Sequence, residues 1–256
     1  MAGIYDQSGT EARFDWGPDG ARELGRDSRV VIVVDILSFS TAIDVAVSHG
    51  AAVYPCQFAH GEAKALALRL GGIETAPRKS TTSDRPFSLS PATMALARPG
   101  MKIVVASPNG AQVSLAAAEC NATVMAGCFR NASAVARAAL AIGTPIAVIA
   151  AGERWFSTNA LRPSFEDQVG AGAILAALAV LGALTMSPEA RVAMSAFRAV
   201  ESDLESALAE CASGRELIAR DFRQDVSWAA EREVSATAPI MRGSAFVDLN
   251  NARPRP

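Results

Sequence analysis

Three groups of polar residues follow directly on apolar, β-rich runs of the chain. Asp35 comes after "VVIVV", Ser107, Asn109 and Gly110 follow "KIVVA", and Glu153 follows "PIAVIAAG". Carboxylates suit a hard divalent cation such as Mg²⁺, whose other positions are filled by water and by phosphate oxygens. Turns that open helices offer backbone N–H groups and a positive dipole end to a phosphate. The combination indicates metal-assisted phosphoryl chemistry.

A second pair of carboxylates widens the set of possible metal ligands. The run "SFEDQVGAGAILAALAVLGAL" predicts a long apolar helix with Ser164 as its N-cap and Glu166 and Asp167 in its first turn. We therefore predict a Mg²⁺ site whose oxygen ligands come from Asp35 and from one or more of Glu153, Glu166 and Asp167.

Each of these groups also has a purely structural interpretation, which the sequence leaves open. A carboxylate at a strand end can cap the next helix, a Ser-Pro-Asn-Gly run is an ordinary tight turn, and acids in a first helical turn suit the dipole. These alternatives apply to Asp35, Ser107 to Gly110, the neighbours Glu153 and Arg154, which could form a simple ion pair, and the pair Glu166 and Asp167.

Other chemistries have less support. The two histidines, His49 and His60, have no metal-ligand spacing and no support for a Ser-His-Asp triad. No GxGxxG or GxxxxGK[ST] run occurs, which argues against dinucleotide and P-loop sites. An aspartyl-phosphate mechanism of the haloacid dehalogenase type would place a second Asp two residues after Asp35, where this chain has Leu37.

The elements that must position these residues follow a repeated pattern. "RVVIVVDILSFSTAIDVAVSHGAAVYPC" and "MKIVVASPNGAQVSLAAAECNATVMAG" each predict a strand, a polar turn, a helix and a second strand. Continuous apolar strands favour a parallel sheet covered on both faces, and the near-equal spacing suggests an internal duplication of βαβ units. Ligands of such sheets bind beyond the carboxyl ends of the strands, so we expect the three polar groups to meet at one rim.

The remaining segments set the domain boundaries. We expect an N-terminal segment over residues 1–29, one α/β domain over 30–249 and a disordered tail over 250–256. The Ser-, Thr- and Pro-rich stretch 71–94 predicts an exposed loop with a short helix starting near Pro91, and amphipathic helices interrupted at Gly214 follow Ser187-Pro188.

Composition limits the partners. The formal charge of −2 and the absence of Lys/Arg runs give no reason to expect nucleic acid or an anionic membrane. The start of the chain has no signal-peptide pattern and no segment is apolar enough for a membrane span, so a cytoplasmic location is expected. Without CxxC or Cys/His pairing, the four cysteines, Cys56, Cys120, Cys128 and Cys211, are predicted to be inert buried thiols.

Six stretches in order resemble the 2-phosphosulfolactate phosphatase (ComB-like) family. They are "VVIVVDILSFSTAIDVAVSHGAAVYP", "SPNGAQ", "GCFRNASAVA", "AAGERW", "FEDQVGAGAI" and "GRELIARDFRQDVSWAAE", and the resemblance spans about Val30 to Asp248. It implies a three-layer α/β/α fold and a Mg²⁺-dependent phosphatase that hydrolyses 2-phosphosulfolactate to sulfolactate and phosphate, a step of coenzyme M biosynthesis.

The chain departs from the family pattern beside Asp35. Many members read Asp-Val-Leu-Arg-Ala there, whereas this sequence has Ser38 and Phe39 in place of Arg-Ala. Arginine is a favoured partner of phosphate and sulfonate groups, so its absence bears on substrate choice. Candidates for its replacement are Arg78, Lys79, Arg130 and Arg154. The second motif keeps its Asn-Gly turn but has Ser107-Pro108 where Thr-Thr is common.

The resulting hypothesis makes Asp35 and Glu153 the catalytic pair, with Glu153 orienting the attacking water and Mg²⁺ binding a phosphate oxygen. The predicted phosphate- and substrate-binding residues are Ser38, Ser40, Thr41, Ser107, Asn109, Gly110, Asn131 and Arg154.

Two alternatives remain: a phosphatase for another small phosphorylated 2-hydroxy acid, and a non-catalytic phosphate- or sulfonate-binding protein. We also expect a homo-oligomer, because the helix "GAGAILAALAVLGALTM" is apolar on more faces than a surface helix needs, unless it is central to the chain's own core.

Overall fold

The structure, a computed structural model, describes residues 3–59 and 61–250 and contains one large sheet. The apolar runs singled out in the sequence form five of its nine strands, and the other four were not predicted. Their order across the sheet is β1 (Ala12–Trp16), β7 (Ile146–Ala150), β2 (Val30–Val34), β6 (Thr123–Ala126), β10 (Pro239–Arg242), β11 (Ala245–Asp248), β3 (Ala52–Cys56), β5 (Lys102–Ala106) and β4 (Ile73–Glu74).

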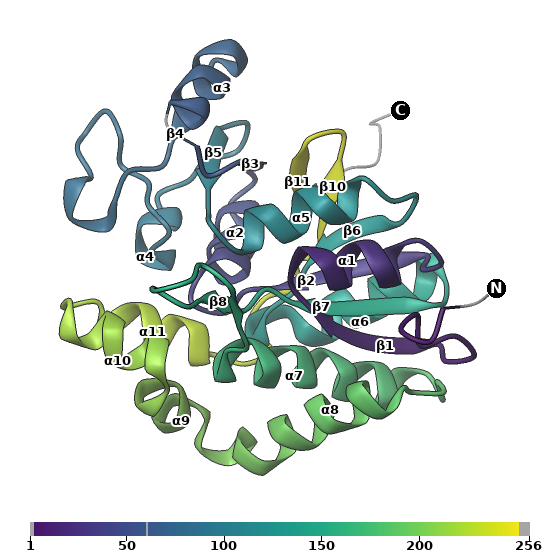
Figure 1. Ribbon diagram of the computed structural model, residues 1–256. Helices are drawn as coiled ribbons and strands as arrows, with labels where there is room; N and C mark the ends of the chain where they lie inside the picture. The colour runs from purple at the N-terminus through teal and green to yellow at the C-terminus, as the bar shows by residue number, and fades with distance from the viewer. Residues whose placement is uncertain (1–2, 60, 251–256) are drawn as a thin grey trace.

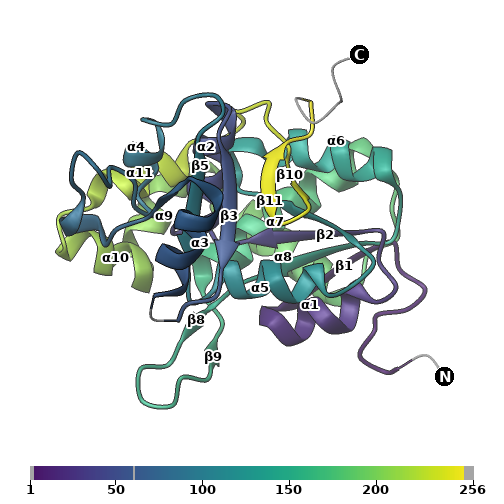
Figure 2. The ribbon, with the colours of Figure 1, turned by 90° about the horizontal axis from the view of Figure 1, so that it is seen from above.

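The sheet consists of two parallel blocks joined by an antiparallel hairpin. Strands β1, β7, β2 and β6 are parallel to one another, as are β3, β5 and β4. The hairpin β10–β11 pairs antiparallel with β6 on one side, through Ile240 and Met125, and with β3 on the other, through Phe246 and Val53. Three antiparallel pairings separate β6 from β3, so the two blocks run in opposite directions. The sheet also twists between the blocks, and β3 is therefore drawn crosswise to β2 in Figure 2.

The two strand-helix-strand units of the sequence cross between these blocks. One runs from β2 through α2 (Phe39–Ser48) to β3, and the other runs back from β5 through α5 (Gly110–Ala118) to β6. The elements are where the sequence predicts them, but the two strands of each unit run in opposite directions and are not neighbours, so neither unit is the parallel βαβ unit that was predicted. The hairpin β10–β11, which no local pattern couples to either unit, separates them. Internal duplication stays a prediction.

Helices cover both faces of the sheet, which confirms the three-layer α/β/α prediction. Helices α1 (Gly17–Gly25), α2 and α5 pack on the face that receives Val31 and Val33. Helices α6 (Ala132–Ile142), α7 (Phe165–Leu181) and α8 (Pro188–Val200) pack on the face that receives Ile32 and Val34 (Figure 1). Alternating residues of a continuous apolar strand thus supply both cores.

The long apolar helix predicted after Ser164 is α7. It lies between the sheet, α6 and α8, so that most of its residues are buried within the chain. The alternative of a helix central to the chain's own core therefore accounts for its apolar faces. The homo-oligomer stays a prediction that now needs other support.

Smaller elements complete the chain. Helix α4 (Pro91–Met94) and helix α8 begin at prolines, Pro91 and Pro188, as predicted. Ser187 Oγ caps α8 by accepting from the Ala190 N–H at 3.0 Å. The predicted interruption at Gly214 is wrong, because the break falls at Cys211. The others are α3 (Glu62–Leu70), α9 (Leu204–Glu210), α10 (Ala212–Ala219), α11 (Arg223–Ala230), the 3₁₀ turns η1 (Arg78–Ser80), η2 (Phe129–Asn131) and η3 (Glu201–Asp203), and the hairpin strands β8 (Glu153–Arg154) and β9 (Leu161–Arg162).

The N-terminal boundary of the domain lies earlier in the structure than the predicted boundary at residue 30. The segment before Val30 supplies edge strand β1 and helix α1, so it belongs to the sheet rather than lying outside it. The predicted tail lies outside the described residues except for Asn250. Cys56, Cys128 and Cys211 are buried thiols, whereas Cys120 is partly exposed. None of the helices in the described ranges combines the length and apolarity that a membrane span needs.

Candidate active site

Asp35 links the first turns of two helices. It follows β2 and is buried, its Oδ1 accepts from the Phe39 N–H of α2 at 3.1 Å, and its Oδ2 accepts from the Gly110 N–H of α5 at 2.8 Å. The capping role considered for Asp35 is therefore present, and it extends to a second helix. Gly110 has to be glycine here, because a Cβ would overlap the Phe39 ring and lie 2.6 Å from Asp35 Oδ2.

Burial raises the pKa of Asp35 to about 6, and the nearby charge of Glu166 adds to this shift. The two backbone N–H donors and the positive charge of Arg78 act in the opposite direction, because they stabilise the carboxylate. A carboxyl group that titrates near neutrality in a buried position is typical of functional sites.

Asn109 connects Glu153 to the start of α5, where the Gly110 N–H contacts Asp35. Glu153 opens β8 after the buried strand β7, and Asn109 Nδ2 donates to Glu153 Oε2 at 2.8 Å. Burial raises the pKa of Glu153 to about 7, with the charge of Asp35 as a second cause. Asn109 Oδ1 is buried and has no hydrogen-bond partner among the described residues. The site thus combines two carboxyl groups and an oxygen that still lacks a donor or a cation.

The three polar groups meet as predicted, but the reason differs from the prediction. Asp35 and Glu153 follow β2 and β7, which are parallel neighbours. Asn109 follows β5 of the opposite block, so a shared strand direction does not bring it there. Instead the hydrogen bond from the Gly110 N–H to Asp35 Oδ2 joins the end of β5 to the end of β2, although four strands separate them in the sheet order.

These residues line a cavity of about 360 Å³, a size typical of small-molecule sites. Its wall includes residues that the sequence prediction did not select, chiefly from the loop before α4 and from α10. The lining residues are Asp35, Leu37, Ser38, Phe58, Arg78, Leu89, Ser107, Pro108, Asn109, Glu153, Ser213, Glu216, Leu217 and Arg220. The stretch "GRELIARDFRQDVSWAAE", one of the six that carry the family resemblance, was the signal for the α10 wall.

Arg78 is the basic residue fixed most firmly in this wall. Its Nε donates to Asp225 Oδ2 at 2.8 Å, and its Nη2 donates to Ser38 Oγ at 2.8 Å. Asp225 is itself held by Ser90 Oγ, which donates to Oδ1 at 2.5 Å. Of the four candidates to replace the arginine expected near Ser38, Arg78 is therefore the one that contacts Ser38.

Two predicted phosphate ligands, Ser40 and Thr41, do not line the cavity. Both are fully buried, and their hydroxyls donate to the backbone carbonyls of Asp35 and Ile36, each at 2.8 Å. They hold the turn after β2. The predicted N–H donor of Gly110 likewise points to Asp35 rather than to open space.

Asn131 and Arg154 also lie away from the cavity wall. Asn131 Nδ2 donates to Asp44 Oδ1 at 3.0 Å in a buried network that includes Arg130. Arg154 alternates with Glu153 on the short strand β8, so it points elsewhere, and its side chain donates to the Asn159 carbonyl at 3.4 Å. Ser38, Ser107, Asn109 and Glu153 remain as predicted residues that share the cavity with Asp35.

The four predicted metal ligands do not form one cage. Within residues 3–59 and 61–250, no group of three or more His, Cys, Asp or Glu side chains is placed to hold a metal ion. Both oxygens of Asp167 already accept: Oδ1 from the Ile36 N–H at 2.7 Å, and Oδ2 from the Gly152 N–H and Ser164 Oγ, each at 2.9 Å. Asp167 therefore ties α7 to the ends of β2 and β7, while Glu166 lies buried beside it.

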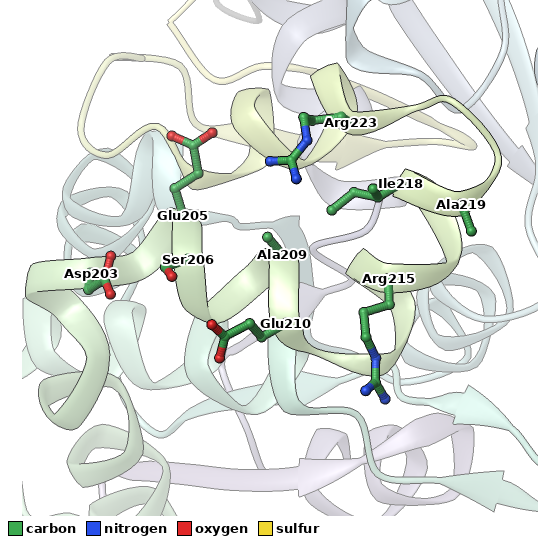
Figure 3. Close-up of a pocket in the computed structure, with 9 residues that line it drawn as sticks. All are labelled: Asp203, Glu205, Ser206, Ala209, Glu210, Arg215, Ile218, Ala219 and Arg223. Carbon is green, nitrogen blue, oxygen red and sulfur yellow. The ribbon is translucent and has the colours of Figure 1, made fainter.

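A larger cavity of about 690 Å³ lies between α9, α10 and α11 (Figure 3). Its charged side chains, which include Glu205, Arg215 and Arg223, are exposed and surround the small apolar surface of Ala209 and Ile218. It holds no buried carboxyl group, so the smaller cavity around Asp35 is the better candidate for chemistry.

One comparison with known proteins bears on this site. A sequence model of the family described as 2-phosphosulpholactate phosphatase matches residues 18–244. The match covers α1 and every strand that contributes to the site. It begins before Val30, in agreement with the place of α1 against the sheet.

Proposed function

Because the chain belongs to the 2-phosphosulpholactate phosphatase family, we propose that it hydrolyses 2-phosphosulfolactate to sulfolactate and phosphate with the help of Mg²⁺. The observation that carries the proposal is the pairing of the buried Asp35 with the half-buried Glu153, two carboxyl groups with raised pKa values, in one cavity of substrate size.

The residues present fit a magnesium ion. Mg²⁺ in proteins is commonly bound by one or two carboxylates, with water and substrate phosphate as its other ligands, so a cage of three acids is unnecessary. Asp35 and Glu153 would supply the carboxylate oxygens, and Asn109 Oδ1 is the buried oxygen that lacks a partner. When bound, the ion would neutralise charge on the phosphate. Asp167 drops out of the predicted set, because its oxygens already accept three hydrogen bonds.

The chain's own groups suit the proton transfers of hydrolysis. Glu153, with a pKa of about 7, can accept a proton from the attacking water or return it to the leaving alkoxide near neutral pH. Asn109 Nδ2 fixes the position of Glu153 Oε2. Asp35 is fixed by the N–H groups of two helices, so it holds its ligand without a change of rotamer.

The test is phosphate release from 2-phosphosulfolactate and 2-phospholactate, with Mg²⁺ and with a chelator. We expect the chelator to stop turnover, and Asp35→Asn and Glu153→Gln to lower kcat at least about a hundredfold. Asp203→Asn, an exposed acid outside the cavity, serves as the matched control. Wild-type rates in both site variants would reject this assignment. Activity confined to other phosphorylated 2-hydroxy acids would keep the chemistry and change the substrate.

A further inference from the structure

Arg78 is held in a way that leaves part of its guanidinium free. Nε is used by Asp225, and Nη2 by Ser38 and, at 3.4 Å, by the Leu89 carbonyl. In the part of the chain that the structure describes, Nη1 makes no hydrogen bond. The side chain is only 15% exposed and lines the cavity. Arg85 Nε and Asn109 Oδ1 are the fully buried side-chain N and O atoms without a partner among the described residues, so Nη1 of Arg78 is accessible, and it offers a free charged donor at the cavity wall.

The contacts around Arg78 also fix its plane. Asp225 is 2% exposed and holds Nε, Ser38 holds Nη2, and the Phe222 ring lies 5.7 Å from the guanidinium carbon. A guanidinium held at one edge and one face presents its remaining N–H groups in a single direction. This is the arrangement that recognises planar carboxylates and other oxyanions.

The other cations near the site are less suited to this task. Arg220 also lines the cavity, but it is exposed and paired with Glu216 at 3.0 Å. Arg162 lowers the pKa of Glu153 by its charge, yet it belongs to the outer strand β9 and does not line the cavity. Arg130 is paired with Asp44 and Glu231 elsewhere.

We propose that Arg78 binds a second acidic group of the substrate, a carboxylate or sulfonate, while the Asp35 and Glu153 end of the cavity receives the phosphate. The inference rests on the proposed phosphatase function, whose substrate already carries such groups, and it adds the residue that selects for them. The site selects phosphomonoesters of short hydroxy acids over phosphomonoesters with an uncharged tail. Ser38 contacts Arg78 and follows Asp35 by only three residues. The phosphate and the second acidic group of such a ligand therefore need be separated by only a few atoms.

The first test compares kcat/KM for 2-phosphosulfolactate, 2-phospholactate and phenyl phosphate in wild type and Arg78→Lys. Lysine keeps the charge but cannot bond Asp225, Ser38 and an anion at once. We expect the preference for the acid-bearing substrates over phenyl phosphate to fall about thirtyfold, through KM more than kcat. Arg137→Lys, exposed on α6, is the matched control and should keep the wild-type ratio. A change of less than about threefold in Arg78→Lys overturns the proposal.

A binding experiment separates this inference from the proposed function, because it needs no turnover. Sulfolactate and lactate are added to wild type, Arg78→Lys and Arg137→Lys, and the thermal midpoint is followed. We expect sulfolactate to raise the midpoint of wild type and Arg137→Lys but not of Arg78→Lys, whether or not phosphate is released from any ester. No stabilisation of wild type, or equal stabilisation of all three proteins, overturns the role of Arg78. Absence of turnover with the expected stabilisation rejects only the phosphatase.

Discussion

At the scale of single residues, Asp35 has the capping role that its position in the sequence suggested, and the proposed metal-binding role depends on the same side chain. It accepts from the first N–H groups of α2 and α5, and it lines the cavity. A carboxylate at the N-termini of two helices gains from both dipoles, yet burial still raises its pKa to about 6. Structure and proposed chemistry therefore depend on the same side chain, and a loss of activity on its substitution has to be read together with stability.

The raised pKa values predict how stability of the metal-free protein depends on pH. Asp35 and Glu153 have pKa values of about 6 and about 7 in the fold, above the ordinary values of 3.8 and 4.5. Between these limits the folded chain binds more protons than the unfolded chain, so the free energy of unfolding falls as pH rises. In chelator, we expect the thermal midpoint to decrease from about pH 5 to about pH 8.

Glu153→Gln tests that dependence, because Gln keeps an oxygen for the Asn109 amide and cannot ionise. The variant should lose about 2–4 °C less than wild type over the same pH range. Glu210→Gln, an exposed acid on α9, is the control and should follow wild type. A midpoint of Glu153→Gln that falls as steeply as that of wild type would contradict the assignment of the titration to Glu153.

The sequence identified those site residues that stand directly after a strand: Asp35, Ser107, Asn109 and Glu153. The end of a strand can be predicted from the local pattern, because the polar residues that follow it differ clearly from the apolar run before them. Arg78 could be named only as one of four candidates. Its place in the cavity depends on Asp225, which is 147 residues away in the chain. No local signal encodes such a contact.

At the scale of elements, Gly110 allows the first turns of α2 and α5 to pack closely against each other. Gly110→Ala would place a Cβ against the Phe39 ring and Asp35 Oδ2, so the two helix starts must separate. We expect a loss of about 1–3 kcal/mol in the free energy of unfolding, measured with urea, together with a loss of phosphatase activity. Ala118→Ser, exposed at the end of the same helix, should change stability by less than about 0.5 kcal/mol. Wild-type activity in Gly110→Ala would show that the site tolerates the separation.

Element boundaries were predicted well where caps and apolar runs coincide. Pro91 and Pro188 both open helices, and Val30 to Val34 form a strand buried on both faces. The boundary at Gly214 was wrong, since a glycine can lie inside a helix when another chain segment packs closely. Here a Cβ on Gly214 would overlap the Leu208 carbonyl.

At the scale of the whole molecule, the hairpin β10–β11 holds the two parallel blocks together. Phe246 is fully buried, is paired with Val53 of β3, and meets Phe39 of α2 edge to face with ring centroids 6.4 Å apart. Phe246→Ala should therefore lower the free energy of unfolding by about 3–5 kcal/mol. Val247→Ala, the partly buried neighbour, should cost less than half as much. Equal losses in the two variants would show that the joint between the blocks depends little on Phe246.

The order of the strands in the sheet could not be predicted from the sequence, because it too depends on contacts between distant segments. Local patterns predicted five of the nine strands in the sheet, and they missed β1, β4, β10 and β11. The rule that ligands bind at carboxyl ends accounts for Asp35 and Glu153, which follow parallel neighbours, but not for Asn109, which follows a strand of the opposite block. The opposite direction of the two blocks follows from Ile240 and Phe246, whose partners Met125 and Val53 lie over a hundred residues away. Strand pairing at such separation leaves no periodic trace in the chain.

The central place of β10–β11 also has a consequence for synthesis on the ribosome. The hairpin occupies the middle of the sheet, yet it is made after all the other strands. Until residues 239–248 leave the exit tunnel, the nascent chain carries two half-sheets whose inner strands, β6 and β3, have unpaired edges. The polypeptide therefore passes through translation in a form open to wrong strand pairing, and its yield depends on what shields those edges in the meantime.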